Sequence, residues 1–230
     1  MAQIRRWHIY PSVAELQTHA ARAILRAAAQ AIATRGRFHI VLAGGRTPKS
    51  IYARLAAAGA DWPHWHVFFG DERCRPVGDT LRNDRAATDS WLGRVAIPPD
   101  QIHGIPAEHG PREAARRYAA TLAPVHRFDF VLLGLGEDGH TASLFPGTLP
   151  AAAADVLPVY DAPKPPPERV TLSAGRLSRA RQVAFVSTGE EKRLAIAAWR
   201  RGDAVPAGAI TPPAGVDILL DTAAWPDRFV

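Results

Sequence analysis

Residues 128–147 read FDFVLLGLGEDGHTASLFPG, and this stretch decides how the rest of the chain is interpreted. Its first half is a continuous apolar run, typical of a strand that is buried on both faces of a parallel sheet. The second half is a loop that carries glycines, Asp138 and His140. Because open α/β folds bind their ligands at the carboxyl edge of the sheet, the stretch predicts a functional site at that edge.

The composition is that of a globular protein. The 230 residues are 47% hydrophobic and 22% charged, and no apolar run approaches the roughly 20 residues that cross a bilayer. Because residues 1–10 carry arginines but no apolar signal core, we expect a cytoplasmic protein with no membrane partner. Cys74 is the only cysteine, which excludes an internal disulfide and a thiolate metal cluster.

The chain is basic, with a net charge of +6. Such a charge serves either nucleic-acid binding or the capture of a small anion in a cleft. The arginines are scattered and are not interleaved with aromatic residues, which favours the small anion. We therefore expect a small anionic ligand and no nucleic acid, and we leave open whether the protein is a monomer or a homodimer.

Strand-like and helical segments alternate along the chain. Strands are predicted at 4–10, 38–43, 66–69, 128–133, 156–160, 169–172, 182–187 and 216–220, and helices from Ser12 to about Thr34, from Pro48 to Leu55, and over 83–92, 111–122 and 188–200. This alternation predicts a three-layer α/β/α fold with a mostly parallel, Rossmann-like sheet. Because similar strands lie on both sides of the proline-rich segment 146–167, we expect residues 1–230 to form a single domain.

The sequence Gly44-Gly45-Arg46-Thr47-Pro48 follows a predicted buried strand and opens a helix. The glycines let the backbone approach a ligand, while Thr47 suits a helix N-cap and Pro48 suits the first turn. Free amides at a helix start attract phosphate. The loop is not a Walker A motif, because the Gly-Lys-Ser/Thr ending is absent. A phosphate site and a tight turn without ligand are equally compatible with this spacing.

Two other strand ends carry charged residues. Thr188 and Glu191 have capping-box spacing, which predicts a helix start and places Lys192 one turn into that helix. Lys192 could reach a phosphate there, but the sequence alone favours an exposed lysine on the helix surface. The triplet 71–73, Asp-Glu-Arg, lies at the carboxyl end of the strand predicted at 66–69. There Arg73 could hold an anionic oxygen of a ligand through two hydrogen bonds. The position of these charges at the end of a strand modestly favours a ligand-binding role over a solvated loop.

The loop with Asp138 and His140 is the remaining candidate. A lone histidine is usually structural, but a histidine after a loop of glycines and acids is a candidate proton acceptor near neutral pH. The same glycines match G-x-G-x-x-G, yet residues 145–147 end any helix there, so we discount a dinucleotide site. His64 and His66 have no third ligand near them in the sequence, and no G-x-S-x-G elbow appears. We therefore expect no metal and no cofactor.

Taken together, these pieces resemble the 6-phosphogluconolactonase family, nearly end to end from Phe38 to Asp221. The blocks that carry the resemblance are GGRTP at 44–48, GDER at 70–73, GLGEDGHTASLFP at 134–146 and RVTL at 169–172. The resemblance implies hydrolysis of 6-phosphoglucono-1,5-lactone to 6-phosphogluconate in the oxidative pentose phosphate pathway, without a metal. It also implies a fold like those of the glucosamine-6-phosphate deaminases and ribose-5-phosphate isomerase.

The resemblance further implies roles for individual residues. His140 would be the general base, Asp138 would orient its imidazole, and Arg73 would stabilise the oxyanion or bind substrate. The substrate-binding residues that the resemblance implies, with the phosphate on the two-glycine loop, are Gly44, Gly45, Arg46, Thr47, Asp71, Arg169 and Lys192.

Two alternatives stay open at this point. The deaminases resemble the chain at both glycine loops, but they carry a glutamate five positions after the histidine, where this chain has Phe145, and a tyrosine where it has Arg73. A non-catalytic sugar-phosphate-binding regulator would need a DNA-binding module, and no helix-turn-helix segment precedes Phe38. One departure from the lactonases is Arg82, where they often have serine.

Overall fold

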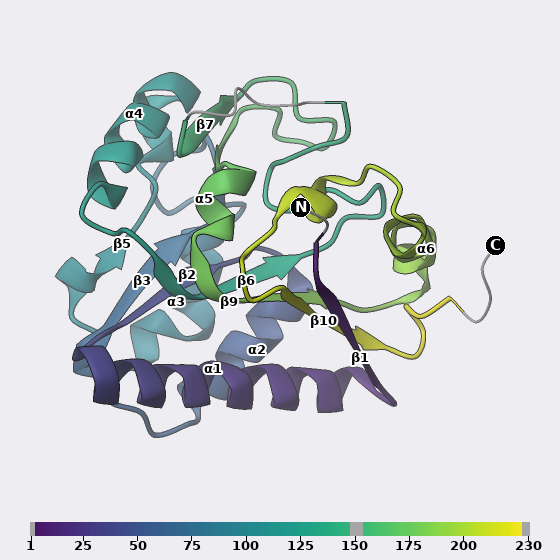
Figure 1. Ribbon diagram of the computed structural model, residues 1–230. Coiled ribbons are helices and arrows are strands. Elements are labelled where there is room, and N and C mark those ends of the chain that lie inside the picture. The colour runs from purple at the N-terminus through teal and green to yellow at the C-terminus, as the bar shows by residue number, and fades with distance from the viewer. Residues whose placement is uncertain (1–2, 148–153, 227–230) are drawn as a thin grey trace.

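A seven-stranded parallel sheet lies between two layers of helices in the computed structural model, which describes residues 3–147 and 154–226 (Figure 1). The order of its strands is β1-β10-β9-β6-β2-β3-β5. The strands are β1 (Arg5–Tyr10), β2 (Phe38–Leu42), β3 (Trp65–Phe69), β5 (Ile102–His103), β6 (Phe128–Gly134), β9 (Ala180–Ser187) and β10 (Val216–Asp221). The predicted three-layer α/β/α architecture is confirmed.

Helices cover both faces of this sheet. In Figure 1 the helices α1 (Val13–Arg35), α2 (Arg46–Ala56) and α3 (Asn83–Ser90) lie on one side, and α4 (Pro111–Leu122) and α5 (Ala174–Ser178) lie on the other. The last helix is α6 (Arg193–Arg201), and short 3₁₀ turns span Trp62–His64, Leu92–Arg94, Pro99–Gln101, Ala107–His109, Glu190–Lys192 and Pro206–Ala209. Among the described residues, no helix is both long enough and apolar enough to cross a membrane.

Local sequence explains the elements that were predicted well. Every residue of β6 from Phe128 to Leu133 is buried, as the continuous apolar run requires. The helix α1 begins where Ser12 accepts a hydrogen bond from the amide of Glu15, and it ends at Gly36, which adopts the left-handed conformation. The helix predicted over 83–92 is shorter, because α3 ends at Ser90.

A second, antiparallel sheet was not predicted. It pairs β4 (Asp71–Arg73) with β8 (Arg169–Leu172), and β8 pairs with β7 (Val156–Val159). Residues 169–172 are a strand as expected, but they lie outside the main sheet. Because three residues are too few to show a periodicity, the sequence indicated β4 only as the end of the preceding strand. This small sheet brings Arg73 and Arg169 side by side.

The strand order places the sequence motifs together. The strands β9, β6, β2 and β3 are consecutive neighbours in the sheet and run parallel. Their carboxyl ends therefore meet at one edge. The loops that follow them begin with Thr188, Leu135, Ala43 and Gly70, and they carry the four motifs found in the sequence.

Three half-buried histidines lie on neighbouring strands of the sheet, away from these loops. His39, His66 and His103 stand side by side on β2, β3 and β5, and the rings of His66 and His103 are stacked, with Nδ1 of His66 at 3.4 Å from Nε2 of His103. Burial lowers the pKa of His39 to about 4 and also lowers the pKa values of the other two. The positive charge of Arg37 also lowers the pKa values of His39 and His66. Asp129 raises the pKa of His39 and Asp100 raises that of His66, but both effects are smaller than that of burial.

We predict that this cluster makes stability depend on pH. Since its folded pKa values lie below the ordinary 6.5, the unfolded chain binds protons more tightly. The contribution of the neutral histidines to the free energy of unfolding is complete above about pH 6.5, and it is lost as the pH falls toward 4. Urea unfolding measured between pH 7.5 and 4.5 gives the free energy of unfolding at each pH. This free energy should fall less steeply with falling pH in His39→Phe than in the wild type. The exposed His126→Phe is the control, and equal slopes in all three proteins would contradict the prediction.

Candidate active site

The loops at the carboxyl edge of the sheet enclose a hollow of about 300 Å³, a size that suits a small ligand. The predicted site residues that line this hollow are Gly44, Gly45, Asp71, Arg73, His140, Arg169 and Lys192. Arg46 and Thr47 line a second hollow of about 640 Å³. The two hollows share Gly44, Gly45 and Lys192, so they adjoin each other.

His140 and Asp138 form a hydrogen-bonded pair at the wall of the first hollow. The carboxylate Oδ1 of Asp138 lies 2.5 Å from Nδ1 of His140 and also accepts a hydrogen bond from the His140 amide at 3.1 Å. Burial raises the pKa of Asp138, but these two hydrogen bonds outweigh burial, so the pKa lies below its usual value. Because Asp138 holds Nδ1, the free nitrogen for proton exchange is Nε2.

Close packing in the loop requires glycine at position 136. A Cβ atom there would stand 2.0 Å from Nδ1 of His140 and 2.7 Å from Oδ1 of Asp138. The amide of Gly136 donates to the carbonyl of His140 at 2.7 Å, which closes the loop. The sequence indicated a loop loosened by glycine, whereas the structure shows that Gly136 makes room for the imidazole.

Four cationic side chains line the hollow, and the sequence analysis identified three of them. They are Arg73, Lys164, Arg169 and Lys192. Lys164 was missed because it lies in the proline-rich segment, which has no motif. The carboxylate of Glu137 stands between the two lysines, 3.6 Å from Lys164 and 3.8 Å from Lys192. The cluster gives the hollow a positive field that attracts anions.

The two arginines of the small sheet differ in how their donors are used. Arg169 is buried, and its Nε and Nη2 donate to the carbonyls of residues 164–166, so it holds that segment at the rim of the hollow. Burial also lowers the pKa of Arg169. Arg73 donates from Nη1 to the carbonyl of Leu81. Its Nε is buried and has no hydrogen-bond partner among the residues that the structure describes.

The helix starts differ from the predicted caps. The N-cap residue of α2 is Gly45, with φ of +104°, so Thr47 lies inside the first turn and does not cap it. Thr188 does not cap a helix either, because α6 begins only at Arg193. Instead, the hydroxyls of Thr47 and Thr188 lie 2.9 Å apart and join the loops that follow β2 and β9. The first amides of α2 still lack acceptors within the helix.

Asp71 lies on the wall of the hollow, but both of its carboxylate oxygens accept hydrogen bonds from protein groups. Oδ1 accepts from Asn83 at 3.1 Å and Oδ2 accepts from Ser143 at 2.7 Å. The sequence analysis did not identify Asn83 or Ser143 as site residues. Ser143 stands inside the histidine block, but nothing local indicates that it contacts a residue on another strand.

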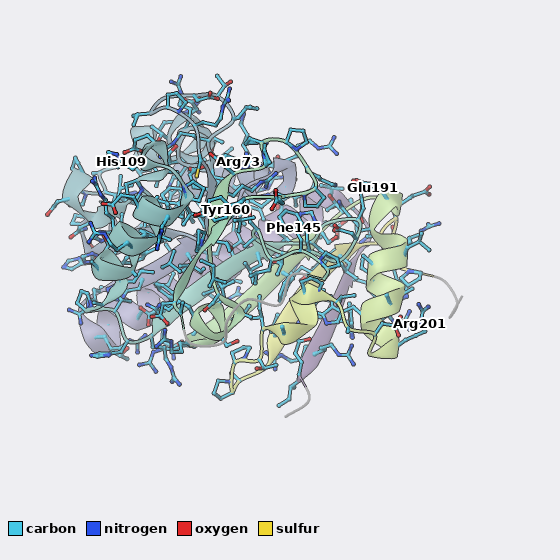
Figure 2. The ribbon with its side chains drawn as sticks, turned by 90° about the horizontal axis from the view of Figure 1, so that it is seen from above. Arg73, His109, Phe145, Tyr160, Glu191 and Arg201 are labelled. Carbon is cyan, nitrogen blue, oxygen red and sulfur yellow. The ribbon has the colours of Figure 1, made fainter. Side chains whose placement is uncertain are left out.

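Phe145 packs against the imidazole of His140, with ring centroids 4.8 Å apart. Its ring also lies 5.6 Å from the guanidinium carbon of Arg169. In the view of Figure 2, Phe145 lies between Arg73 on one side and Glu191, in the 3₁₀ turn that precedes α6, on the other. An apolar ring therefore occupies the position at which the deaminase pattern would place a carboxylate.

Comparison with known proteins points to one family. Residues 11–219 match the family described as glucosamine-6-phosphate isomerases/6-phosphogluconolactonase. The chain is 38% identical to the 6-phosphogluconolactonase of Mycobacterium leprae over 211 residues, which are 85% of this chain and 84% of that protein. It is also 38% identical to the 6-phosphogluconolactonase of a Synechocystis strain, over 85% of this chain and 86% of the relative.

Solved structures agree with this result. A 6-phosphogluconolactonase from Trypanosoma brucei superposes with a TM-score of 0.86 at 27% identity, over 97% of this chain and 98% of that one. A monomeric glucosamine-6-phosphate deaminase superposes with a TM-score of 0.82 at 19% identity, over 95% of this chain and 98% of that one. The latter likeness concerns the fold alone.

We predict that Gly136→Ala displaces the imidazole of His140, because the new methyl group would overlap it. Such overpacking should lower the free energy of unfolding by about 1–3 kcal/mol. Histidine-selective ¹⁵N NMR should show shifted His140 resonances. Gly59→Ala is the matched control, since a Cβ atom there meets nothing within 4 Å. Unmoved His140 resonances in Gly136→Ala would refute the packing argument.

Proposed function

This chain belongs to the glucosamine-6-phosphate isomerase/6-phosphogluconolactonase family, and on that premise we infer that it is a 6-phosphogluconolactonase. It hydrolyses 6-phospho-D-glucono-1,5-lactone to 6-phosphogluconate. The observation that carries this function is the convergence of the Asp138–His140 pair and four cationic side chains on one small hollow. A general base and a positive cleft are what the hydrolysis of an anionic lactone needs.

The substrate phosphate would bind where the two hollows meet. The first amides of α2 have no acceptor in the helix, and the positive end of the helix dipole lies there as well. Lys192 lines both hollows and would add a charge-assisted hydrogen bond. Lys164, which pairs with the same Glu137 carboxylate as Lys192, would add a second cation near the phosphate. A phosphate held there leaves the sugar ring in the hollow that contains His140.

His140 would act as the general base. Nε2 takes a proton from water, the water oxygen forms a bond to C1 of the lactone, and negative charge develops on the carbonyl oxygen. Collapse of this intermediate breaks the bond between C1 and the ring oxygen, the ring oxygen takes the proton back from Nε2 of His140, and the new carboxyl group loses its proton to solvent. Asp138 keeps the imidazole oriented and stabilises its charged form. The guanidinium of Arg73, which lines the hollow, is the donor group that we assign to the oxyanion.

The structure favours this reaction over amine loss from an amino sugar. The latter requires ring opening and several proton transfers, whereas lactone hydrolysis requires one activated water molecule. Phe145, packed on His140, supplies no acid or base. We therefore propose lactone hydrolysis and not deamination.

We also propose that residues 1–230 form one domain and that the protein acts in the cytoplasm, within the oxidative pentose phosphate pathway. Support for one domain comes from β1, which pairs with β10, so that segments near both ends of the chain share a sheet. The cleft is suited to a small sugar phosphate. We expect no nucleic-acid partner, because three of the cationic residues that the sequence singled out, Arg73, Arg169 and Lys192, line the hollow.

We predict that His140→Ala lowers kcat by about 10²–10⁴-fold, because it removes the general base. The affinity for 6-phosphogluconate should stay within about threefold of the wild type. Turnover is measured with fresh lactone at mildly acidic pH, coupled to 6-phosphogluconate dehydrogenase. His109→Ala is the control, since Figure 2 shows His109 at the far side of the molecule. Turnover of His140→Ala at the wild-type rate would exclude the base assignment.

Lys192→Ala should act mainly on substrate binding. Loss of one charge-assisted hydrogen bond, about 1.5–3 kcal/mol, corresponds to a KM raised by roughly 10–100-fold, with kcat little changed. The exposed Lys49→Ala is the matched control. A change in kcat alone would show that Lys192 acts on the chemical step. Glucosamine 6-phosphate, assayed in parallel for ammonia release, should give no product with any of these proteins.

A further inference from the structure

A chain of buried polar side chains begins at the wall of the hollow, which Asp71 and Asn83 line, and links two of its loops. It runs from Asn83 through Asp71 to Ser143, whose exposed fractions are 5%, 6% and 2%. The amide nitrogen Nδ2 of Asn83 donates to the carbonyl oxygen of Asp71 at 2.9 Å and to its Oδ1 at 3.1 Å. The hydroxyl of Ser143 donates to Oδ2 of Asp71 at 2.7 Å. We call these three residues the polar relay.

The engagement of Asp71 argues against a direct role in substrate binding. Both carboxylate oxygens accept hydrogen bonds from neutral donors, and the group is buried. Rotation toward a ligand would leave the donors of Asn83 and Ser143 buried and unsatisfied, which costs about 1–3 kcal/mol for each group. The carboxylate is therefore placed to join two parts of the protein.

One end of the relay abuts the loop that carries Gly44. A Cβ atom at position 44 would stand 2.1 Å from Oδ1 of Asn83 and 2.7 Å from its Cγ. The side chain of Asn83 is thus packed directly on the backbone of this loop. Because protein interiors are close-packed, a shift of Asn83 changes the place of the loop that is to receive the phosphate.

The other end of the relay holds the turn that carries His140. Ser143 lies three residues after His140, and its amide donates to the hydroxyl of Thr171 on β8 at 3.2 Å. Thr141 and Leu144 exchange backbone hydrogen bonds around it, and Ala142 adopts a positive φ of 50°. A turn this tight has few alternative conformations, so fixing Ser143 also fixes His140.

A buried ion cluster fixes the position of Asn83 itself. The amides of Asn83 and Asp84 donate to the fully buried carboxylate of Glu72, which takes the place of an N-cap side chain for α3. Arg82 is also buried, 4.0 Å from Glu72, and it forms ion pairs with Asp84 and Glu108. The arginine that departs from the lactonase pattern therefore anchors the start of α3.

We propose that Asn83, Asp71 and Ser143 are positioning residues that set the distance between His140 and the loop carrying Gly44. The proposal rests on the proposed function and deepens it. None of the three is assigned contact with the reacting atoms, and their effect passes through His140. A misplacement of about 1 Å between a catalytic group and a bound substrate can cost about 10²-fold in rate, so the relay should be visible in kcat.

The test compares Ser143→Ala, Asn83→Ala and their double variant with Ser90→Ala. Ser90 is the matched control, because it is a buried serine in α3 whose hydroxyl bonds only within that helix, to the carbonyls of Ala86 and Ala87. We expect Ser143→Ala to lower kcat by about 10–100-fold. Its Kd for 6-phosphogluconate should change by less than about threefold, and its Tm should fall no further than that of Ser90→Ala.

The double variant tests whether the residues act as one unit. Because both effects pass through Asp71, kcat of the double variant should fall no further than that of the worse single variant. The proposal would be overturned if the fold-loss in kcat of the double variant equalled the product of the two single fold-losses. It would also be overturned if Ser143→Ala kept the kcat of the wild type. If Asn83→Ala does not fold, Asp71→Asn replaces it, since the amide keeps the shape of the side chain and loses one acceptor.

Histidine-selective ¹⁵N NMR separates the relay from the proposed function. Ser143→Ala should shift the His140 resonances and Ser90→Ala should not, whether or not the protein hydrolyses the lactone. If the wild type shows no lactonase activity but these shifts occur, the function fails and the relay stands. If the wild type is active and Ser143→Ala leaves the His140 resonances unmoved, the relay fails and the function stands.

Discussion

The parallel pairing of β9, β6, β2 and β3 is the constraint on which the site depends. Parallel strands end at the same edge, so four loops that are far apart in the sequence meet there. Most residues of these strands are buried, and the close packing of side chains on both faces of the sheet holds the strands in place.

Within that edge, the chemistry depends on a contrast between two environments. The imidazole of His140 is held by Asp138 and backed by the apolar ring of Phe145. The cationic side chains of Arg73, Lys164 and Lys192 line the same hollow. In the mechanism that we propose, the imidazole takes a proton while the cationic side chains hold the anionic substrate.

The small antiparallel sheet gives the site its second wall. Its pairing of β4 with β8 places Arg73 beside Arg169, and it carries Asp71 to Ser143 across 72 residues of sequence. Burying polar groups is costly unless their hydrogen bonds are satisfied, and both oxygens of Asp71 are satisfied. The buried cluster of Glu72 and Arg82 extends the same arrangement to the start of α3. Glu72 is fully buried, and this withdrawal from water raises the pKa of its carboxyl group.

The sequence by itself determined the layers of the fold and most of the residues that line the hollow. Apolar runs such as 128–133 indicated buried strands, and the residues after each run indicated where His140, Arg73 and the two-glycine loop would lie. These signals are local, because burial on both faces and the conformational needs of a turn are set by adjacent residues. The same kind of local signal assigned Thr47 and Thr188 as helix caps, and those two assignments were wrong. The N-cap residues are the glycines Gly45 and Gly189.

Only the tertiary structure decided which distant groups became partners. Lys164 and Lys192 both form ion pairs with Glu137, and Ser143 donates a hydrogen bond to Asp71. No sequence pattern predicts these contacts from the spacing of the residues. Such contacts arise from strand order and from the antiparallel pairing of a three-residue strand, which has too few residues to show a period. Periodicity predicts which face of an element is buried. The hydrogen-bond partner of a buried polar group depends on which element the fold brings against it, and local sequence does not record that choice.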